Sequence, residues 1–269
     1  TQYKFNPDII VDSEQSYFKD QKNPKFNVAI IREEGSNSDR EMAAAFHHAG
    51  AKVTDVTTSE LINKKIDLDD YVGIVFVGGF SFADVLGSGI GWASVLESFI
   101  EPLQKFYSRT ETFSLGVCNG CQLMIHLLDF FNWTGLDTIS KKTDTSPKKF
   151  KSHISLQTNI SNRFESRFPT LKINSTNSLW FQNMANTEYG VWSSHKEGRF
   201  VIDNVNTMKN LFENNMIPLQ YCDSNGDATI HYPLNPNGSV NGIAAIQSKN
   251  GRHLACLLYT SDAADDVIS

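Results

Sequence analysis

Residues 115–122 have the sequence LGVCNGCQ, which contains the pattern G-x-C-x-G centred on Cys118. The apolar run at residues 113–117 predicts a buried strand, and residues 119–130 predict a helix that follows it directly. A turn this sharp strains the backbone of the central residue, and the glycines two positions to either side remove side chains that would clash there. The pattern is the cysteine form of a nucleophile elbow. It fixes one strand–helix unit, around which the other predicted elements are arranged.

Outward from this unit, the sequence alternates between apolar runs and amphipathic segments. Strands are expected at residues 26–31, 52–56 and 72–77, and helices at residues 38–50 and 91–107. Ser38 and Glu41 have the capping-box spacing at the start of the first helix. This order predicts a parallel, doubly wound α/β sheet with strands buried on both faces. Short β-rich runs at residues 153–157, 189–193 and 199–202 predict antiparallel pairing within the same domain.

The chemistry expected at Cys118 is nucleophilic attack. The following helix points its N–H groups and its positive dipole end at the sulfur, which favours the thiolate. The amide of Asn119 then faces an oxygen that becomes negative when a carbonyl is attacked. An oxyanion hole needs a second donor, and Gly79 is well placed for this if the strand at residues 72–77 is a neighbour.

Cys118 and Cys121 also form a C-x-x-C pair, a spacing found in redox and zinc sites. No second C-x-x-C or H-x-x-H pair accompanies it, so no metal is expected. A redox dithiol is disfavoured because Cys121 would lie within the helix and the flanking glycines would have no purpose. A plain buried cysteine at a strand end remains an alternative before other motifs are considered.

Composition excludes several classes of protein. The 269 residues are 40% hydrophobic and 20% charged, which is typical of one large or two small globular domains. Lys and Arg total 24 against 30 Asp and Glu, a net charge of −6 without a basic block, so no nucleic-acid partner is expected. No apolar run approaches the ~18–20 residues that cross a bilayer, so no membrane association is expected. Four cysteines are too few for a disulfide scaffold, which fits a reducing, cytoplasmic location.

Five motifs resemble one family in consistent order. They are REEGSNSDREM at 32–42, GGFSFADVL at 78–86, GVCNGCQ at 116–122, NRFE at 162–165 and YPLNPNGS at 232–239. The sequence is similar to the glutaminase domain of large, single-chain phosphoribosylformylglycinamidine synthases. The resemblance implies a class I glutamine amidotransferase-like, flavodoxin-like fold. This fold is an α/β three-layer sandwich with a mostly parallel central sheet and extra antiparallel strands.

The resemblance also implies an activity. A domain of this kind hydrolyses glutamine through a Cys-His-Glu triad and passes ammonia to synthetase domains of the same full-length chain. Those absent domains use ATP and Mg²⁺ to convert formylglycinamide ribonucleotide to the amidine in purine biosynthesis, and no cofactor is expected in this segment. Carried over to this sequence, Cys118 is the nucleophile, and Asn119 and Gly79 supply oxyanion amides. Gln122, Phe80 and His195 are expected to contact the substrate glutamine.

The C-terminal residues depart from the family pattern. The family places a His-Pro-Glu-Arg motif after the strand that here contains His253, whereas Tyr259 and Ser261 occupy the expected histidine and glutamate positions. Residues 256–269 resemble translated sequencing-adapter DNA and are expected to be non-native. The triad histidine and glutamate are therefore absent, and we expect the chain as written to be nearly inactive. His195 and Glu197 repeat the H-x-E spacing but match a separate family segment.

The expected organisation is a linker at residues 1–24, a glutaminase domain at 25–255 and the tail at 256–269. The chain starts at Thr1, so we expect a C-terminal fragment of a longer protein. Two alternatives remain, namely a non-catalytic amidotransferase-like interaction domain and a stand-alone glutaminase subunit. His47 and His48 are expected to be solvated, and Trp180, Phe181, Trp192 and Phe200 to pack in the core.

Overall fold

A computed structural model of the chain describes residues 24–84, 87–137, 140–141 and 150–258. The expected linker, apart from residue 24, and residues 259–269 of the expected tail lie outside the described residues. The remaining tail residues are part of the fold, because Cys256 ends a strand and Leu257 and Leu258 are buried.

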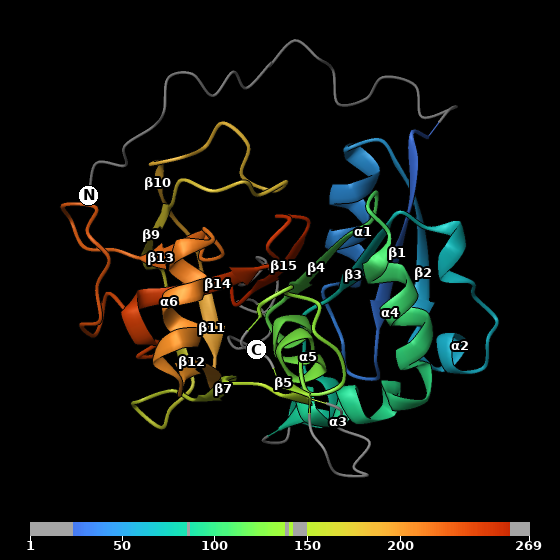
Figure 1. Cartoon of the computed structure of the whole chain (residues 1–269), viewed down its shortest axis with the longest axis horizontal. Helices are drawn as coiled ribbons and strands as arrows, with labels where there is room; N and C mark the ends of the chain where they lie inside the picture. Colours follow the sequence, from blue (N-terminus) through green and yellow to red (C-terminus); the bar gives the residue numbers. More distant parts are fainter. Residues whose placement is uncertain (1–23, 85–86, 138–139, 142–149, 259–269) are drawn as a thin grey trace, which may run out of the picture.

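Within the described residues, one large sheet of nine strands organises the structure (Figure 1). In spatial order the strands are β10 (Glu188–Gly190), β9 (Thr170–Ile173), β13 (Leu219–Tyr221), β14 (Ile243–Gln247), β15 (His253–Cys256), β4 (Phe113–Val117), β3 (Gly73–Phe76), β1 (Phe26–Arg32) and β2 (Ala51–Thr57). The strands from β15 to β2 are parallel, and β14, β13, β9 and β10 extend the sheet by antiparallel pairing. The predicted α/β class, with antiparallel strands in the same domain, is confirmed.

Smaller elements surround this sheet. Three two-stranded ladders pair β7 (Ile154–Thr158) with β12 (Glu197–Ile202), β8 (Glu165–Arg167) with β11 (Ser193–His195), and β5 (Ser140–Lys141) with β6 (Phe150–Lys151). The α-helices are α1 (Asp39–His48), α2 (Thr58–Ile62), α3 (Ser88–Val95), α4 (Ile100–Ser108), α5 (Asn119–Leu127) and α6 (Val205–Glu213). Short 3₁₀ segments are η1 (Leu68–Asp70), η2 (Ser81–Asp84), η3 (Leu96–Phe99) and η4 (Val240–Gly242).

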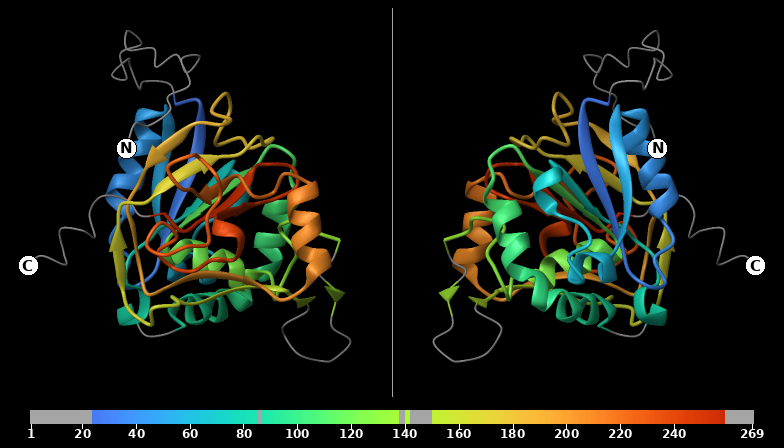
Figure 2. Two further views of the ribbon diagram at one scale, coloured as in Figure 1. Left: turned by 90° about the vertical axis from the view of Figure 1, so that its left-hand side faces the viewer. Right: turned by 90° about the vertical axis from the view of Figure 1, so that its right-hand side faces the viewer.

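Helices cover both faces of the parallel strands (Figure 2). Successive residues of β1 point to opposite faces. Val28 and Ile30 pack with Met42 of α1, whereas Ala29 and Ile31 join the larger cluster that includes α3, α4 and α5. Each of these β1 residues is fully buried, which explains why the strand is a continuous apolar run. The result is three layers, with the sheet in the middle.

The single helix predicted at residues 91–107 is divided into α3, η3 and α4. Pro102 lies in the first turn of α4 and has no N–H to donate to the carbonyl of Ser98. A continuous helix would lose that hydrogen bond and force the proline ring against the preceding turn. Phe99 therefore leaves the helical conformation, with φ −111° and ψ 11°, and a new helix begins after it.

The capping box predicted for Ser38 and Glu41 is not formed. Ser38 precedes α1 at the expected place, but its φ of −102° and ψ of 22° differ from an extended N-cap and its side chain makes no capping bond. Its hydroxyl is instead buried close to Gly78. A capping box forms at α2, where the Thr57 N–H donates to the Glu60 carboxylate at 2.9 Å and the Glu60 N–H donates to the Thr57 hydroxyl at 3.3 Å.

The aromatic residues expected in the core divide into two groups. Phe200 is fully buried, and Trp180 and Phe181 pack half-buried against the antiparallel end of the sheet. The prediction for Trp192 is wrong, because its side chain is 40% exposed beside the ring of Phe168, with 5.3 Å between ring centroids. Trp192 lies in the connection between β10 and β11. His47 and His48 are exposed as predicted.

Two helical glycines allow a matched test of how closely α5 approaches the sheet. A Cβ on Gly120 of α5 would lie 2.0 Å from the carbonyl oxygen of Phe76, whereas a Cβ on Gly91 of α3 would meet only the Phe82 ring at 3.5 Å. We expect Gly120→Ala to lower the free energy of unfolding by about 2–3 kcal/mol in urea titration. Gly91→Ala should leave it unchanged or raise it by up to about 1 kcal/mol. Equal effects of the two substitutions would contradict this packing.

Candidate active site

Cys118 lies at the turn between β4 and α5, as the sequence predicts. Its backbone has φ 52° and ψ −107°, a region that residues other than glycine rarely adopt. The N–H of Cys118 donates to the carbonyl of Cys256 at 3.0 Å, which ties the turn to the neighbouring strand β15. The side chain is 8% exposed, so the thiol sits at the edge of the core. Such strain persists only where the surrounding structure enforces it.

Glycines permit this turn, also as predicted. A Cβ on Gly116 would lie 2.5 Å from the carbonyl oxygen of Gly120, and a Cβ on Gly120 would lie 2.0 Å from that of Phe76. On the other side, a Cβ on Gly78 would come within 3.1 Å of the Cys118 Cβ. Three glycines therefore allow β3, β4 and the start of α5 to converge on the thiol.

A small pocket of 30 Å³ opens beside Cys118. Its lining includes every residue that the sequence analysis selected, namely Gly79, Phe80, Cys118, Asn119, Gln122 and His195. It also includes four residues that the sequence analysis did not select, namely Phe164, Ser194, Lys196 and Glu197. The available signal for these four was that Phe164 belongs to the NRFE motif and that Ser194, Lys196 and Glu197 flank His195 in the sequence. The structure thus brings together segments from four distant parts of the chain.

Gly79 reaches the pocket through a loop that only glycine can form. Its φ is 133°, and a Cβ would lie 2.5 Å from the backbone nitrogen of Asn37. An isolated bridge pairs Gly79 with Ser36, using the N–H groups of Asn37 and Phe80. The bridge therefore does not use the Gly79 amide. Strand β3, which precedes this loop, pairs with β4 as the oxyanion prediction required.

A row of side-chain hydrogen bonds crosses the pocket from α5 to β12. Ser81 donates through its hydroxyl to the Asn119 side-chain oxygen, and Asn119 Nδ2 donates to Gln122 Oε1 at 2.8 Å. Gln122 Nε2 then donates to the carbonyl of Glu197 at 2.6 Å. The Glu197 carboxylate accepts from the N–H of Gly87 at 2.9 Å. This row fixes one wall of the pocket against the nucleophile-bearing helix.

His195 lies in the pocket wall, and its ring is engaged by the side chain of Asn237. Its Nε2 is 3.2 Å from Asn237 Nδ2, an amide donor, so Nε2 acts as the acceptor and the ring proton lies on Nδ1. Burial lowers the pKa of His195 to about 4, against a smaller opposing effect of the Glu165 carboxylate. The ring is therefore neutral at pH 7. The Cys118 Sγ faces the carbonyl oxygen of Ser194, the residue before this histidine, at 3.9 Å.

The positions expected for the triad pair, Tyr259 and Ser261, lie outside the described residues. Among the residues that the structure does describe, His195 is the only histidine lining the pocket.

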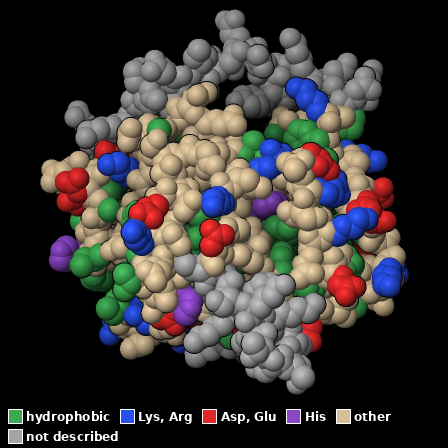
Figure 3. Space-filling model, in the orientation of Figure 1, with side chains coloured by type: hydrophobic (Ala, Val, Ile, Leu, Met, Phe, Trp, Pro, Cys, Tyr) green, Lys and Arg blue, Asp and Glu red, His purple; other side chains and the backbone are tan. Residues whose placement is uncertain are grey.

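Within the same residues, no group of three or more His, Cys, Asp or Glu side chains is arranged to hold a metal ion. No described helix has both the length and the apolar character to cross a bilayer. Charges of both signs are interspersed on the face drawn in Figure 3.

Comparison with known sequences identifies relatives. The profile of a family described as a CobB/CobQ-like glutamine amidotransferase domain matches residues 25–267. A probable phosphoribosylformylglycinamidine synthase, chloroplastic/mitochondrial, from Arabidopsis thaliana is 45% identical over 90% of this chain and 17% of its own length. The phosphoribosylformylglycinamidine synthase of Homo sapiens is 42% identical over 89% of this chain and 18% of its own length. The chain thus spans less than a fifth of these curated relatives.

Solved structures show the same fold at low sequence identity. PurLQS from Thermotoga maritima matches with a TM-score of 0.59 and 21% identity, over 87% of this chain and 86% of that chain. A putative GMP synthase subunit from Thermoplasma acidophilum matches with a TM-score of 0.51 and 11% identity, over 87% and 84% of the two chains. At these identities the likeness concerns the fold alone.

The buried His195 generates a pH prediction. Its pKa is about 4 in the folded state and near 6.5 when unfolded, so below pH 6.5 the unfolded chain binds a proton that the folded chain does not. Stability is therefore expected to fall as the pH drops from 6.5 toward 4. His195→Gln should reduce this slope by up to about 1.4 kcal/mol per pH unit in urea unfolding. The exposed His47→Gln serves as control, and an equal change of slope in both variants would contradict the assignment.

Proposed function

Because the chain belongs to the family of CobB/CobQ-like glutamine amidotransferase domains, we propose that it is the glutaminase part of a phosphoribosylformylglycinamidine synthase. The names of its relatives, at 42–45% identity, support this choice within the family. In the proposal, ammonia released here serves the ATP-dependent conversion of formylglycinamide ribonucleotide to formylglycinamidine ribonucleotide in purine biosynthesis. ATP and Mg²⁺ act in synthetase domains of the longer protein, and a cytoplasmic location is part of the same proposal.

The proposed reaction runs through a thioester. The Cys118 sulfur attacks the side-chain amide carbon of glutamine, and the carbonyl oxygen becomes an oxyanion held by the amides of Asn119 and Gly79. Collapse of this intermediate breaks the C–N bond, and the nitrogen takes up a proton and leaves as ammonia. Water then attacks the thioester, which restores the thiol and releases glutamate. The sum is glutamine plus water giving glutamate plus ammonia.

The observation that carries the proposal is the conformation of Cys118. A φ of 52° at a strand-to-helix turn turns the thiol toward the pocket and places it at the N-terminus of α5. A plain buried cysteine at a strand end needs neither this strain nor the glycines around it. The adjacent loop contributes Gly79, whose amide is not used by the bridge to Ser36.

The pocket is too narrow for glutamine as the structure stands. A volume of 30 Å³ corresponds to about one water molecule, so glutamine enters only if a wall moves. The wall formed by Ser194, Lys196 and Glu197 is fastened to α5 by the Gln122 bond to the Glu197 carbonyl. In the proposal, glutamine takes over part of this bonding when it binds. This gives Gln122 its expected contact with the substrate.

A second candidate function is a non-catalytic amidotransferase-like interaction domain. It is favoured by the absence of His-Pro-Glu-Arg after His253 in this sequence. His195 is a poor substitute base, because burial lowers its pKa to about 4, so it holds a proton weakly, and because its Nε2 is engaged by Asn237. A stand-alone glutaminase subunit is less favoured, because the chain matches a small share of much longer relatives.

A glutamine-derived electrophile tests the nucleophile in the chain as it is. We expect a glutamine diazoketone to label Cys118 slowly, as detected by peptide mass spectrometry, because attack by sulfur does not require the missing base. Cys118→Ser should abolish the label, while Cys222→Ser, a matched change at another buried cysteine, should retain it. Labelling at another cysteine in preference to Cys118 would contradict the proposed role.

Restoring the family motif tests the enzyme against the interaction domain. The chain as written should show no measurable ammonia release from glutamine, whereas Y259H, T260P, S261E and D262R combined should produce turnover. Adding Cys118→Ala to that variant should lower kcat/KM by at least about a thousandfold. Turnover by the unaltered chain would show that the proposed triad positions are wrong. Full activity with Cys118→Ala would exclude the cysteine mechanism.

A further inference from the structure

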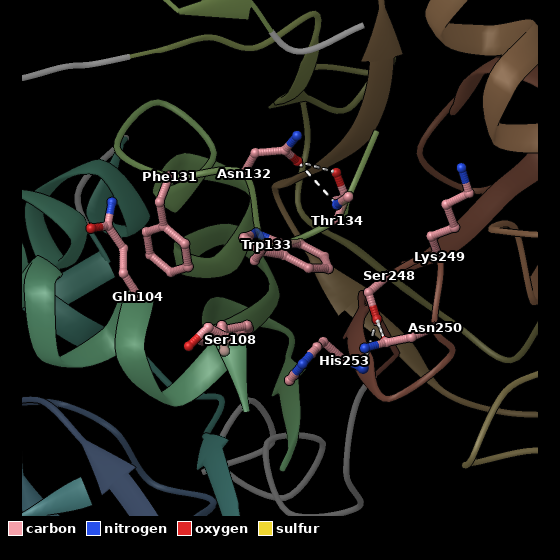
Figure 4. A pocket seen from close by; sticks show the side chains of 12 residues that line it. Gln104, Ser108, Phe131, Asn132, Trp133, Thr134, Ser248, Lys249, Asn250 and His253 are labelled. Carbon is pink, nitrogen blue, oxygen red and sulfur yellow. Dashed lines mark hydrogen bonds between the residues drawn. The ribbon is translucent and has the colours of Figure 1, made fainter. Parts of the chain in front are cut away.

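A second and larger cavity lies at the opposite end of β4 from the Cys118 site. Its volume is 630 Å³, within the range of small-molecule sites. His253 on its wall pairs with Ser114 near the start of β4, four residues before Cys118. At the rise of a strand, this separates the two sites by about 13 Å. Figure 4 shows the cavity between α4, the segment after α5 and the turn that leads into β15.

Aromatic rings form one part of the cavity wall. The Tyr107 ring has its centroid 5.2 Å from that of Phe131, 6.4 Å from that of Trp133 and 4.4 Å from that of the His253 ring. The Trp133 indole is fixed, because its N–H donates to the Met124 carbonyl at 2.7 Å. Such surfaces favour a flat ring, which gains from stacking as well as from burial.

Hydrogen bonds among its own residues order the polar part of the wall. Thr134 Oγ1 donates to Asn132 Oδ1 at 2.8 Å, and Ser248 Oγ donates to Asn250 Oδ1 at 2.6 Å. The N–H of Lys249 donates to the Thr134 carbonyl at 2.8 Å and joins these two turns. A preformed wall lowers the entropy lost when a ligand binds.

His253 supplies an unused hydrogen-bonding group. Its side chain is 1% exposed, Nδ1 lies 3.1 Å from the Ser114 hydroxyl, and Nε2 is buried with no hydrogen-bond partner among the described residues. Burial lowers the pKa of His253 to about 3, with a smaller contribution from Arg252, so the ring is neutral at pH 7. A buried polar atom without a partner costs stability, which makes a ligand partner favourable.

Charge narrows the class of ligand. Lys249 is the one ionisable lining side chain besides His253 and Tyr107 among the described residues, and it lies 52% exposed at the rim. Its ammonium is 3.9 Å from the Asp137 carboxylate. No carboxylate side chain belongs to the described lining. The interior therefore suits an uncharged ring rather than a cation or a metal ion.

We propose that this cavity binds an uncharged, planar heteroaromatic ring of the nucleobase class. The ring stacks on the aromatic wall of Tyr107 and Trp133, and a donor or acceptor on its edge bonds His253 Nε2. Because Nε2 is buried in the structure, this bond forms when the adjacent Tyr107 ring shifts enough to expose it while still stacking on the bound ring. Binding here is independent of glutamine hydrolysis at Cys118.

The test is an NMR titration of the whole ¹⁵N-labelled chain with adenosine, guanosine, cytidine and uridine. We expect at least one nucleoside to bind with Kd of about 1 mM or tighter and to shift the imidazole ¹⁵N resonances of His253. Those resonances are assigned with His253→Gln. Cys118→Ser should bind as the unaltered chain does, so this result stands whether or not the glutaminase proposal holds.

A pair of aromatic variants provides the control. Tyr107→Leu should weaken nucleoside binding about fivefold, whereas Phe168→Leu, a change to an exposed aromatic residue outside the cavity, should leave it unchanged. Ribose alone should produce no shift. The proposal is overturned if no nucleoside shifts the His253 resonances, if ribose does so equally, or if the two leucine variants bind alike.

Discussion

Helix α5 starts so close to strand β3 that the backbone of Gly120 touches the backbone of Phe76, with no side chain between them. This close approach sets the distance between the start of α5 and the sheet. To place α5 at that distance, the chain must complete its turn from β4 within one residue. Cys118 takes up that turn with its positive φ. The strain at the cysteine is thus a consequence of packing between helix and sheet, maintained by the buried contacts on both sides of β3.

The Gly120–Phe76 contact positions α5, and hydrogen bonds between residues distant in sequence then attach the β11–β12 wall of the small pocket to it. The Gln122 bond to Glu197 joins residues 75 apart in sequence, and Gly87 and Glu197 are 110 apart. The β11–β12 wall therefore depends on side-chain bonds to α5 and to the loop before α3. The narrow pocket and its wall are held by the same hydrogen bonds, so access of glutamine to the thiol is linked to release of these bonds.

The sequence was most informative where one local constraint decides the structure. The glycines around Cys118 and the alternation of apolar runs predicted the turn, β4 and a sheet of parallel strands, but not the spatial order of those strands. Prediction failed where a contact distant in sequence decides the outcome. The Ser38 hydroxyl is buried near Gly78 instead of capping its own helix, and Trp192 is left uncovered in a connection between strands. The break at Pro102 was available from its missing N–H, whereas the Asn237 contact that engages His195 was not, since 42 residues separate them.

The position of β15 has a consequence for how the polypeptide is made. Although β15 comes last among the described strands, it lies in the interior of the sheet, between β14 and β4. As the nascent chain leaves the ribosome, both neighbours present unpaired edges, which are open to wrong partners until β15 inserts. Its insertion joins the parallel and antiparallel halves and brings the Cys256 carbonyl to the Cys118 amide. The ribosome must therefore complete β15 before the parallel half of the sheet, which carries Cys118, can reach its native structure.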